Sequence, residues 1–455
     1  MAIQHNTIRS LPDIQIKGAF SSPVSGISID TRTLNAGELF VAFSGAQVDG
    51  HDFIPKAISR GASAVMASTH WDGIETWDAS IPLILTEDSV KTLAELAHAH
   101  RMHFDIPVIA ITGTNGKTTT KNLLAHILRK KYQVLSTDGN FNNHIGLPIT
   151  LLNLNEKHEY AVLEMGASQK GDIKYLCDIA APSQGLITNI SMAHTEFFHD
   201  VDTIQKTKGE LFDYLEANGG EVFVNLDDDR VAEIGAGMTS RTTFSFTEGA
   251  DAVYSLADPD RFGSYDIKFQ NTTAHLSHPG KALALNAAAA TTIALGNAIE
   301  IDTVVEALQD YPGEQGRMQH VEVGSIHFLN DAYNANPASV RLGLETLGSL
   351  KIDARKILVF ADMLELGEQS QELHLEVAEM VLEADFDHIF LYGIESMAIA
   401  QHLELNNYTS FYYNVEKAAT IQRFLRMVSS GDLVYLKGSR GMKLEDFIQA
   451  YKERK

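Results

Sequence analysis

Val108-Ile-Ala-Ile-Thr-Gly-Thr-Asn-Gly-Lys-Thr-Thr-Thr120 is the stretch that decides how the centre of this chain folds. Its β-branched first half predicts a strand, its glycines predict a tight loop, and the loop opens a helix. Backbone N–H groups of such a loop can face an anion, Lys117 adds a positive charge, and the Thr118 hydroxyl can bind Mg²⁺. The stretch therefore predicts a phosphate cradle for a nucleoside triphosphate, formed by Gly113, Thr114, Asn115, Gly116, Lys117, Thr118 and Thr119.

This cradle departs from the common P-loop pattern, which requires a glycine where the chain has Ile111. An ordinary helix start capped by Asn115 would also contain Gly-Lys-Thr. The order of strand, loop and helix favours the phosphate-binding interpretation.

The composition is that of an ordinary globular protein, with 44% hydrophobic and 21% charged residues among 455. Lys and Arg number 36 against 59 Asp and Glu, and the formal net charge of −23 disfavours general nucleic-acid binding. The single cysteine, Cys177, excludes an intrachain disulfide and fits a reducing compartment. The N-terminus lacks a signal-peptide pattern and no apolar run reaches the roughly 18 residues of a membrane span. We therefore expect a cytoplasmic protein without a membrane span.

The pattern of elements predicts an α/β protein of three domains. Residues 1–105 contain short β-like pieces followed by helical patterns, and Ile106-Pro107 marks a boundary. Residues 106–314 alternate strands with helices, which predicts a mostly parallel sheet, and Pro312-Gly313 marks the next boundary. In residues 315–455 the alternation returns and predicts a smaller, doubly wound, Rossmann-like domain.

Apolar periodicity places the individual elements. The expected central strands are Val108–Thr112, Gln133–Ser136, Ala161–Met165, Gly185–Ile190 and Glu221–Asn225, and Arg241–His278 is expected to be mainly β. The expected central helices are Lys117–Lys131, Asp172–Ala180, Asp202–Leu215 and Lys281–Ile299. The expected strands of the third domain are Lys356–Ala361, His388–Tyr392, Phe411–Tyr413 and Leu433–Leu436.

Three polar residues follow successive strands of the central domain: Thr118, Glu164 and His194. Ligands of doubly wound sheets bind at the carboxyl ends of the strands, and Mg²⁺ takes carboxylate and phosphate oxygens there. Glu164 is therefore a metal candidate, and the same placement favours a ligand role for His194. The alternatives are a glutamate that reaches solvent and a histidine that is hydrogen-bonded within the fold.

Three further polar loops are candidate ligand loops: Thr137–Pro148, Leu329–Pro337 and Lys437–Lys443. The alternatives are a turn-rich connection for the first and a solvated basic turn for the last. Their candidate residues are Asn140, Asn143, Asp331, Asn334, Asn336, Lys437, Ser439 and Arg440.

Taken together, these residues resemble the Mur ligase family, ATP-dependent enzymes that build the peptide of bacterial peptidoglycan. The cradle is similar to the family's short form of the P-loop, which accounts for its missing first glycine. The resemblance covers nearly the whole chain and includes Asp30-Thr-Arg32, Gly37-Glu-Leu-Phe40, Asp49-Gly-His51, Gly139-Asn-Phe-Asn-Asn-His-Ile-Gly-Leu-Pro148, Lys208-Gly-Glu-Leu-Phe212, Asp331-Ala-Tyr-Asn-Ala-Asn-Pro337, Met363-Leu-Glu-Leu-Gly367 and Lys437-Gly-Ser-Arg440.

Within the family, the chain is most similar to the enzymes that join D-alanyl-D-alanine to UDP-N-acetylmuramoyl-tripeptide through an acyl phosphate. The resemblance implies that residues 1–105 bind the UDP-linked substrate, residues 106–314 bind ATP, and residues 315–455 close over ATP and bring the dipeptide. The substrate-binding residues it implies are Asp30, Thr31, Arg32, Asn140, Asn143, Asn334, Asn336, Lys437, Ser439 and Arg440.

The resemblance also implies the residues of the ATP and metal sites. Asn286 would contact adenine, and Arg317 and Asp331 would contact ATP from the domain junction. Two Mg²⁺ ions are expected, one held by Thr118 and Glu164 and the other by Glu164, His194 and Lys208.

Lys208 is expected to carry a carbamate from CO₂, because an ammonium would be repelled by Mg²⁺ whereas a carbamate is anionic. The implied catalytic residues are Lys117, Glu164, His194 and Lys208. By itself, however, the run from Lys206 to Glu210 also fits a solvated helix face.

Three positions depart from the family's motifs. Thr31 stands where serine is usual, which keeps the hydroxyl, and Asn330 stands in place of the first aspartate of Asp-Asp-Ala-Tyr. Gly280-Lys-Ala-Leu283 precedes Asn286 where the family has Gly-x-His-Asn, so the His-Asn pair is absent.

Two other classes of protein are consistent with part of the pattern. Another ligase of the same superfamily, such as the enzyme that adds the third residue or a folylpolyglutamate synthase, would share the cradle. A P-loop switch or scaffold protein would share it too, but Glu164 and His194 favour an enzyme. A dinucleotide oxidoreductase is disfavoured because no Gly-x-Gly-x-x-Gly follows a strand at the start of a domain. We expect a monomer whose partners are small molecules.

Overall fold

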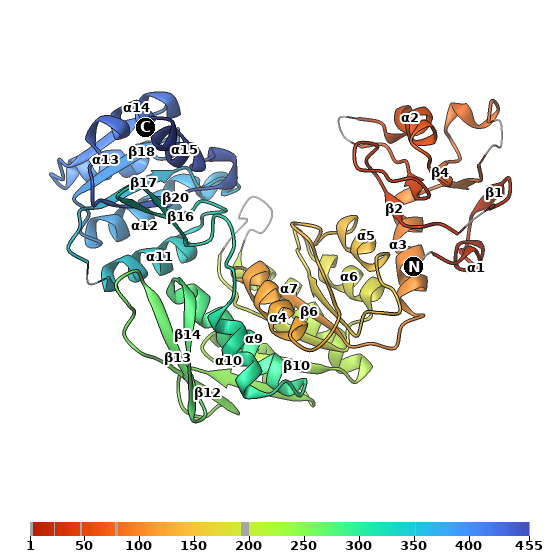
Figure 1. Ribbon diagram of the computed structural model, residues 1–455, viewed down its shortest axis with the longest axis horizontal. Coiled ribbons are helices and arrows are strands. Elements are labelled where there is room, and N and C mark those ends of the chain that lie inside the picture. The colour runs from red at the N-terminus through yellow and green to blue at the C-terminus, as the bar shows by residue number, and fades with distance from the viewer. Residues whose placement is uncertain are drawn as a thin grey trace.

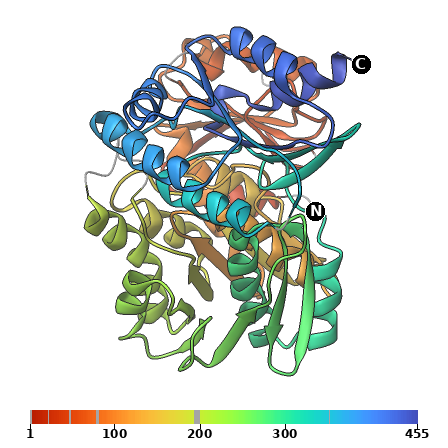
Figure 2. The same cartoon turned by 90° about the vertical axis from the view of Figure 1, so that its left-hand side faces the viewer.

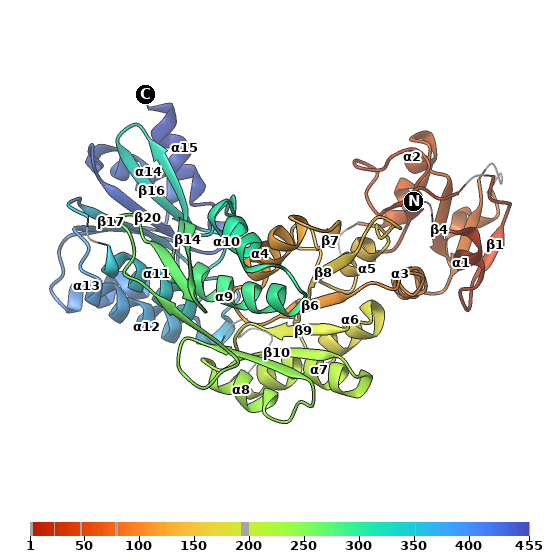
Figure 3. The ribbon, with the colours of Figure 1, turned by 60° about the horizontal axis from the view of Figure 1, so that its bottom comes forward.

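The computed structural model describes residues 3–21, 23–45, 48–77, 81–192, 200–350 and 352–454. These residues form three sheets that follow one another along the chain, each with its own helices. The first and third units lie at opposite ends of the molecule, with the second between them (Figures 1 and 3). The predicted α/β architecture of three domains is confirmed.

The first unit has a five-stranded sheet in the order β1-β5-β4-β3-β2, parallel except for β1. Its last helix, α3, packs on α5 and α6 of the central domain, and one hydrophobic core continues from the first unit into the second. The elements are α1 (His5–Arg9), β1 (Gln15–Lys17), β2 (Ile27–Ser28), β3 (Leu39–Val41), α2 (Ile54–Ser59), β4 (Ala64–Ser68), β5 (Leu83–Thr86) and α3 (Ser89–Arg101).

The central sheet has nine strands in the order β14-β13-β12-β11-β10-β9-β6-β8-β7. Strands β7 to β12 run parallel, and β13 and β14 extend the sheet in antiparallel fashion. The strands are β6 (Val108–Thr112), β7 (Val134–Ser136), β8 (Tyr160–Glu164), β9 (Gln184–Ile187), β10 (Glu221–Asn225), β11 (Arg241–Ser245), β12 (Ala252–Leu256), β13 (Ser264–Phe269) and β14 (Thr272–Pro279). The predicted parallel sheet and the predicted β character of its last part are therefore confirmed.

The central helices are α4 (Lys117–Arg129), α5 (Gly146–Leu151), α6 (Asp172–Ala180), α7 (Val201–Asn218), α8 (Asp229–Gly235), α9 (Lys281–Gly296) and α10 (Ile301–Gln309). Helix α9 is rich in alanine and buried. Its small side chains allow it to pack closely against α4. Residues 185–190 were expected to be strand throughout, but β9 ends at Ile187. The residues that follow turn toward the cradle instead.

The third unit has a six-stranded sheet in the order β15-β16-β20-β17-β18-β19, parallel except for β15. Its helix α11 packs on α9, so the two domains meet through a helix pair (Figure 2). The elements are β15 (Gln319–Val323), β16 (Ile326–Asp331), α11 (Pro337–Ser349), β17 (Lys356–Ala361), α12 (Ser370–Glu383), β18 (His388–Tyr392), α13 (Met397–Leu405), β19 (Phe411–Asn414), α14 (Lys417–Met427), β20 (Leu433–Lys437) and α15 (Glu445–Glu453).

Candidate functional site

The predicted cradle is a tight loop between β6 and α4, and its two glycines cannot be replaced without a collision. Gly113 and Gly116 have φ angles of 142° and 82°. A Cβ atom at Gly113 would lie 1.9 Å from Thr188 Oγ1, and one at Gly116 would lie 2.3 Å from Asn286 Oδ1. The loop therefore closes against its neighbours, and the first-turn N–H groups of α4 have no acceptor within that helix.

Residues after β9 brace the cradle from the side. The Thr114 N–H donates to Asn189 O at 2.9 Å, and the Asn115 N–H donates to Asn189 Oδ1 at 3.0 Å. The Thr188 hydroxyl donates to Asn115 O at 2.6 Å. Thr188 and Asn189 thus fix the loop, although no local pattern in the sequence distinguishes them from other polar residues at strand ends.

Lys117 lies inside the loop that it was predicted to serve. Its Nζ donates to Gly113 O at 2.8 Å and to Thr114 O at 2.9 Å. Burial lowers the pKa of Lys117, and the Arg317 guanidinium acts in the same direction whereas Glu164 opposes it. The ammonium is therefore held by carbonyl oxygens at the centre of the cradle, within the electrostatic field of Glu164.

Glu164 ends β8 and is 3% exposed. Its Oε1 accepts a hydrogen bond from Asn142 Nδ2 at 2.7 Å, and its N–H donates to Thr137 Oγ1 at 2.9 Å. Its Oε2 is buried and has no hydrogen-bond partner among the described residues. An unpaired buried carboxylate oxygen is costly, so this atom fits a cation that the protein binds here.

Lys208 on α7 is buried, with 6% of its surface exposed. Burial and the nearby charge of Lys117 lower its pKa well below the usual range. A neutral amine is the form that reacts with CO₂, so the environment of Lys208 fits the expected carbamate. The predicted alternative of a solvated face is wrong for this residue.

The other expected metal ligands are placed only in part. His194 lies outside the described residues. Within the described ranges, no three His, Cys, Asp or Glu side chains cluster in a way that could hold a metal ion. Thr118 has its hydroxyl 3.0 Å from Arg317 Nη2, which donates to it across the domain junction. Thr118 and Glu164 supply the hydroxyl and carboxylate oxygens that suit Mg²⁺.

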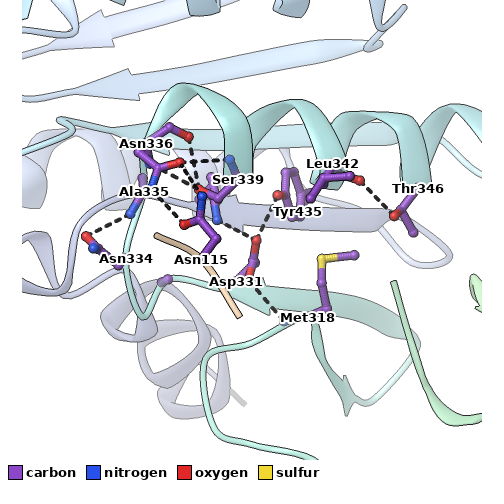
Figure 4. A network of polar contacts seen from close by, with 12 residues as sticks. Asn115, Met318, Asp331, Asn334, Ala335, Asn336, Ser339, Leu342, Thr346 and Tyr435 are labelled. Atoms are coloured by element: carbon purple, nitrogen blue, oxygen red, sulfur yellow. Dashed lines mark hydrogen bonds and ion pairs between the residues drawn. The ribbon is translucent and has the colours of Figure 1, made fainter. Parts of the chain in front are cut away.

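Asp331 is the centre of a polar network at the end of β16 (Figure 4). Its Oδ2 accepts hydrogen bonds from Lys437 Nζ at 2.6 Å and from the Tyr435 hydroxyl at 3.1 Å. Its Oδ1 accepts from the Met318 N–H at 3.2 Å. Burial raises the pKa of Tyr435 and the Asp331 charge adds to that shift, so the phenol stays a donor.

Two of the three candidate residues in the predicted basic turn at residues 437–443 have partners within the protein. Lys437 is buried in its ion pair with Asp331. Ser439 is buried as well, and its Oγ accepts from the Leu364 N–H at 2.8 Å. Arg440 is exposed and lies over the Tyr333 ring, with 5.7 Å between guanidinium carbon and ring centroid. Of these three candidate residues, Arg440 alone is exposed to solvent.

Asn336 joins the third domain to the cradle (Figure 4). Its Nδ2 donates to Asn115 Oδ1 at 2.8 Å, and Asn115 Nδ2 lies 3.4 Å from Asn336 Oδ1. The same Oδ1 accepts from the Ser339 N–H at 2.9 Å and so caps α11. Asn334 makes a local contact, accepting from the Ala335 N–H at 2.9 Å.

A cavity of about 120 Å³ lies between the central and third domains. Its wall includes Gly116 of the cradle and Asn286, where the sequence predicted adenine contact. Ala282 and Leu283, which occupy the positions of the absent His-Asn pair, also line it. The remaining lining residues are Asn115, Thr119, His278, Pro279, Gly280, Tyr311, Gly313, Glu314, Arg317, Met318, Asp331, Tyr333, Asn334, Asn336, Ser339, Leu342, Gly343, Thr346 and Lys437.

Seven of the predicted substrate residues do not line this cavity, Ser439 and Arg440 among them. Asp30 forms an exposed ion pair with Arg32 at 2.7 Å, while Thr31 between them is buried. Arg32 lowers the pKa of the Asp30 carboxyl through hydrogen bonds. Asn143 Oδ1 accepts from the Gly146 N–H at 2.9 Å at the start of α5, and Asn140 is exposed.

Comparison with protein families places three matches along the chain. Residues 23–101 match the family described as "Mur ligase family, catalytic domain". Residues 111–294 match "Mur ligase middle domain", and residues 316–440 match "Mur ligase, glutamate ligase domain".

Individual proteins match over nearly the full length. The UDP-N-acetylmuramoyl-tripeptide--D-alanyl-D-alanine ligase of Bacillus subtilis (strain 168) is 31% identical over 461 residues, which cover 97% of each chain. The crystal structure of MurF from Acinetobacter baumannii has a TM-score of 0.88 at 27% identity and covers 100% of this chain and 99% of its own. MurF ligase from Thermotoga maritima, solved in complex with ADP, has a TM-score of 0.82 at 29% identity and covers 94% and 97%. In the described part of this chain, no helix has the length and apolar character needed to cross a membrane.

Proposed function

Because this chain belongs to the Mur ligase family, we propose that it joins D-alanyl-D-alanine to UDP-N-acetylmuramoyl-tripeptide with ATP as the source of energy. The observation that carries this proposal is the buried, unpaired Oε2 of Glu164 at the strand end next to the cradle. A buried carboxylate oxygen without a partner beside a phosphate cradle fits a bound metal ion, and neutralising the charge of two anionic reactants is what an ATP-dependent ligase needs.

The reaction begins when the terminal carboxylate of the tripeptide attacks the γ-phosphorus of ATP. The bond from that phosphorus to the ADP oxygen breaks, and an acyl phosphate and ADP result. The neutral amine of the dipeptide then attacks the acyl carbon to give a tetrahedral intermediate. Collapse of this intermediate expels inorganic phosphate, and the amine loses one proton as the amide forms.

The residues of this chain contribute mainly by position and charge. The cradle N–H groups and Lys117 bind the phosphates, and Arg317 reaches the cradle from the third domain. Bound Mg²⁺ would neutralise phosphate charge; Thr118 and Glu164 would hold one ion, and Glu164, His194 and a carbamylated Lys208 the second. The cavity that Asn286 lines would take the adenine.

The substrates are assigned to the outer domains. Asp30, Thr31 and Arg32 would bind the UDP group from residues 1–105, while residues 106–314 hold ATP. Residues 315–455 would bring the dipeptide, for which exposed Arg440 offers a carboxylate partner. Each of these groups comes from one chain, so we propose that the enzyme acts as a monomer. Light scattering tests the monomer, which should have a mass of 49.9 kDa. The nucleotide-linked substrates favour a location in the cytoplasm.

Phosphate release from ATP tests the proposed function directly. Release should require both UDP-N-acetylmuramoyl-tripeptide and D-alanyl-D-alanine, and mass spectrometry should detect the joined product. Phosphate release with neither substrate, or with glutamate and a folate instead, would refute it. Assays with tripeptides that end in diaminopimelate or in lysine would then identify the third residue.

A further inference from the structure

Arg317 is held from three sides at the junction of the central and third domains. Its Nε pairs with Glu314 Oε2 at 3.0 Å, and its Nη2 donates to Thr118 Oγ1 at 3.0 Å. Its guanidinium carbon lies 4.1 Å from the centroid of the Tyr333 ring. The carboxylate and the hydroxyl fix two edges of the guanidinium, and the ring covers its face.

Glu314 is itself held in place. The Tyr311 hydroxyl donates to Glu314 Oε1 at 2.9 Å, while Oε2 serves Arg317. The Glu314 side chain is 13% exposed, so its charge acts in a poorly solvated setting. Glu314 and Thr118 bond to nitrogen atoms of the guanidinium, and the Tyr333 ring supplies the remaining contact.

The position of the Tyr333 ring is determined by the backbone. The Tyr333 N–H donates to Gly316 O at 2.9 Å. Arg317 directly follows Gly316 in the chain, so this hydrogen bond brings Tyr333 next to Arg317. Gly316 has a φ of 74°, and a Cβ there would lie 3.3 Å from Tyr333 N. Among the described residues, the Tyr333 hydroxyl makes no hydrogen bond. The ring, and not the hydroxyl, is thus the part of Tyr333 that contacts Arg317.

We propose that Tyr333 is a positioning residue whose ring holds the Arg317 guanidinium in the orientation that directs it at the phosphate cradle. The aromatic face attracts a cation, and a guanidinium carbon 4.1 Å from the ring centroid is close enough for the ring to restrict its movement. Arg440 approaches the same ring at 5.7 Å, so two cations interact with this one aromatic ring. This inference rests on the proposed function to the extent that Arg317 serves ATP.

Direct binding of MgATP, measured by calorimetry without the other two substrates, tests the proposal. Y333L should weaken MgATP binding about 10-fold, which corresponds to about 1.4 kcal/mol and lies within the range of a partly desolvated cation–π contact. Y333F keeps the ring and should bind MgATP within about 2-fold of the wild type. Equal losses in Y333F and Y333L would overturn the proposal.

A double-mutant cycle separates positioning from a general effect on the fold. R317A should weaken MgATP binding on its own, and Y333L in the R317A background should weaken it by less than about 2-fold more. A further 10-fold loss in that background would show that Tyr333 acts without Arg317, and the proposal would be wrong. Melting temperatures of all variants show whether Y333L perturbs the fold.

The binding readout keeps this inference distinct from the proposed function. If the chain joined other substrates, the cycle on MgATP binding would still give the coupling between Tyr333 and Arg317. If the ligase assay succeeded and the cycle showed no coupling, the proposed function would stand and the role of Tyr333 would fall.

Discussion

Asn336 has two roles that substitutions can separate. Its Oδ1 caps α11 through the Ser339 N–H, and its Nδ2 donates to Asn115 Oδ1 in the cradle at 2.8 Å. N336A removes both contacts. Loss of the cap should cost about 1 kcal/mol, and loss of the short hydrogen bond about another 1 kcal/mol. The 3.4 Å contact in the opposite direction is too long to add much.

N336D provides the matched comparison. A carboxylate can still accept from the Ser339 N–H, and a negative charge at a helix N-terminus is favourable by about 0.3–1 kcal/mol. The aspartate cannot donate to Asn115, however, and it places a negative charge beside a site for phosphates. N336D should therefore keep most of the stability and lose more of the MgATP affinity.

Differential scanning fluorimetry and calorimetry measure the two effects. The loss of about 2 kcal/mol in N336A should lower the melting transition of the third domain by about 4–8 °C. N336D should lower it by less than half of that. MgATP affinity should fall about 10-fold in N336D and about 3-fold in N336A, in line with one added charge near the phosphates. Equal melting temperatures in the two variants, or stronger MgATP binding by N336D than by N336A, would refute the reasoning.

Three further substitutions test other parts of the structure. G116A would place a Cβ 2.3 Å from Asn286 Oδ1 at a φ of 82°, so we expect loss of nucleotide binding by calorimetry, and an unchanged Kd would contradict the cradle geometry. D331N leaves the buried Lys437 ammonium without its carboxylate and should lower the free energy of unfolding in urea by about 3–5 kcal/mol; K437M added to D331N should recover part of that loss. Burial lowers the pKa of His388 to about 4, with Arg423 and Arg355 acting in the same direction. The folded chain then binds fewer protons than the unfolded chain between about pH 4 and pH 6.5, so stability falls as pH falls through that window; H388F should melt with a weaker dependence on pH there, and an unchanged pH dependence would show that His388 does not contribute to it.

The sequence predicted the cradle and the parallel sheets because both have local signals. The β-branched run, the two glycines and the cationic Lys117 all lie within one short stretch, and the structure confirms the order of strand, loop and helix. Helix α5 was missed for a local reason too. Gly146 and Pro148 are typical of a turn, but Asn143 Oδ1 accepts from the N–H of Gly146, the first residue of the helix. Pro148 stands in the first turn, where an N–H would have no acceptor within the helix.

Long-range pairing could not be predicted from the sequence. Lys437 was expected to bind a ligand in a basic turn, yet it is the register partner of Asp331 on neighbouring parallel strands. Nothing near either residue indicates that β16 and β20 lie side by side, because more than one hundred residues separate them. The hydrogen bonds that Thr188 and Asn189 make with the cradle could not be predicted for the same reason, because they depend on β9 lying beside β6.

The polar residues of the site differ in whether the protein itself satisfies them. Asp331 and Lys437 satisfy each other, and Asn336 satisfies both a helix end and Asn115. Glu164 Oε2 has no partner within the described residues, and Lys208 is buried with a pKa far below the usual range. A fold selected for stability alone would replace both residues with apolar side chains of similar size. Their retention is explained if ligands compensate them, which favours the surroundings of Lys117, whose charge interacts with both residues, as the place of the chemistry.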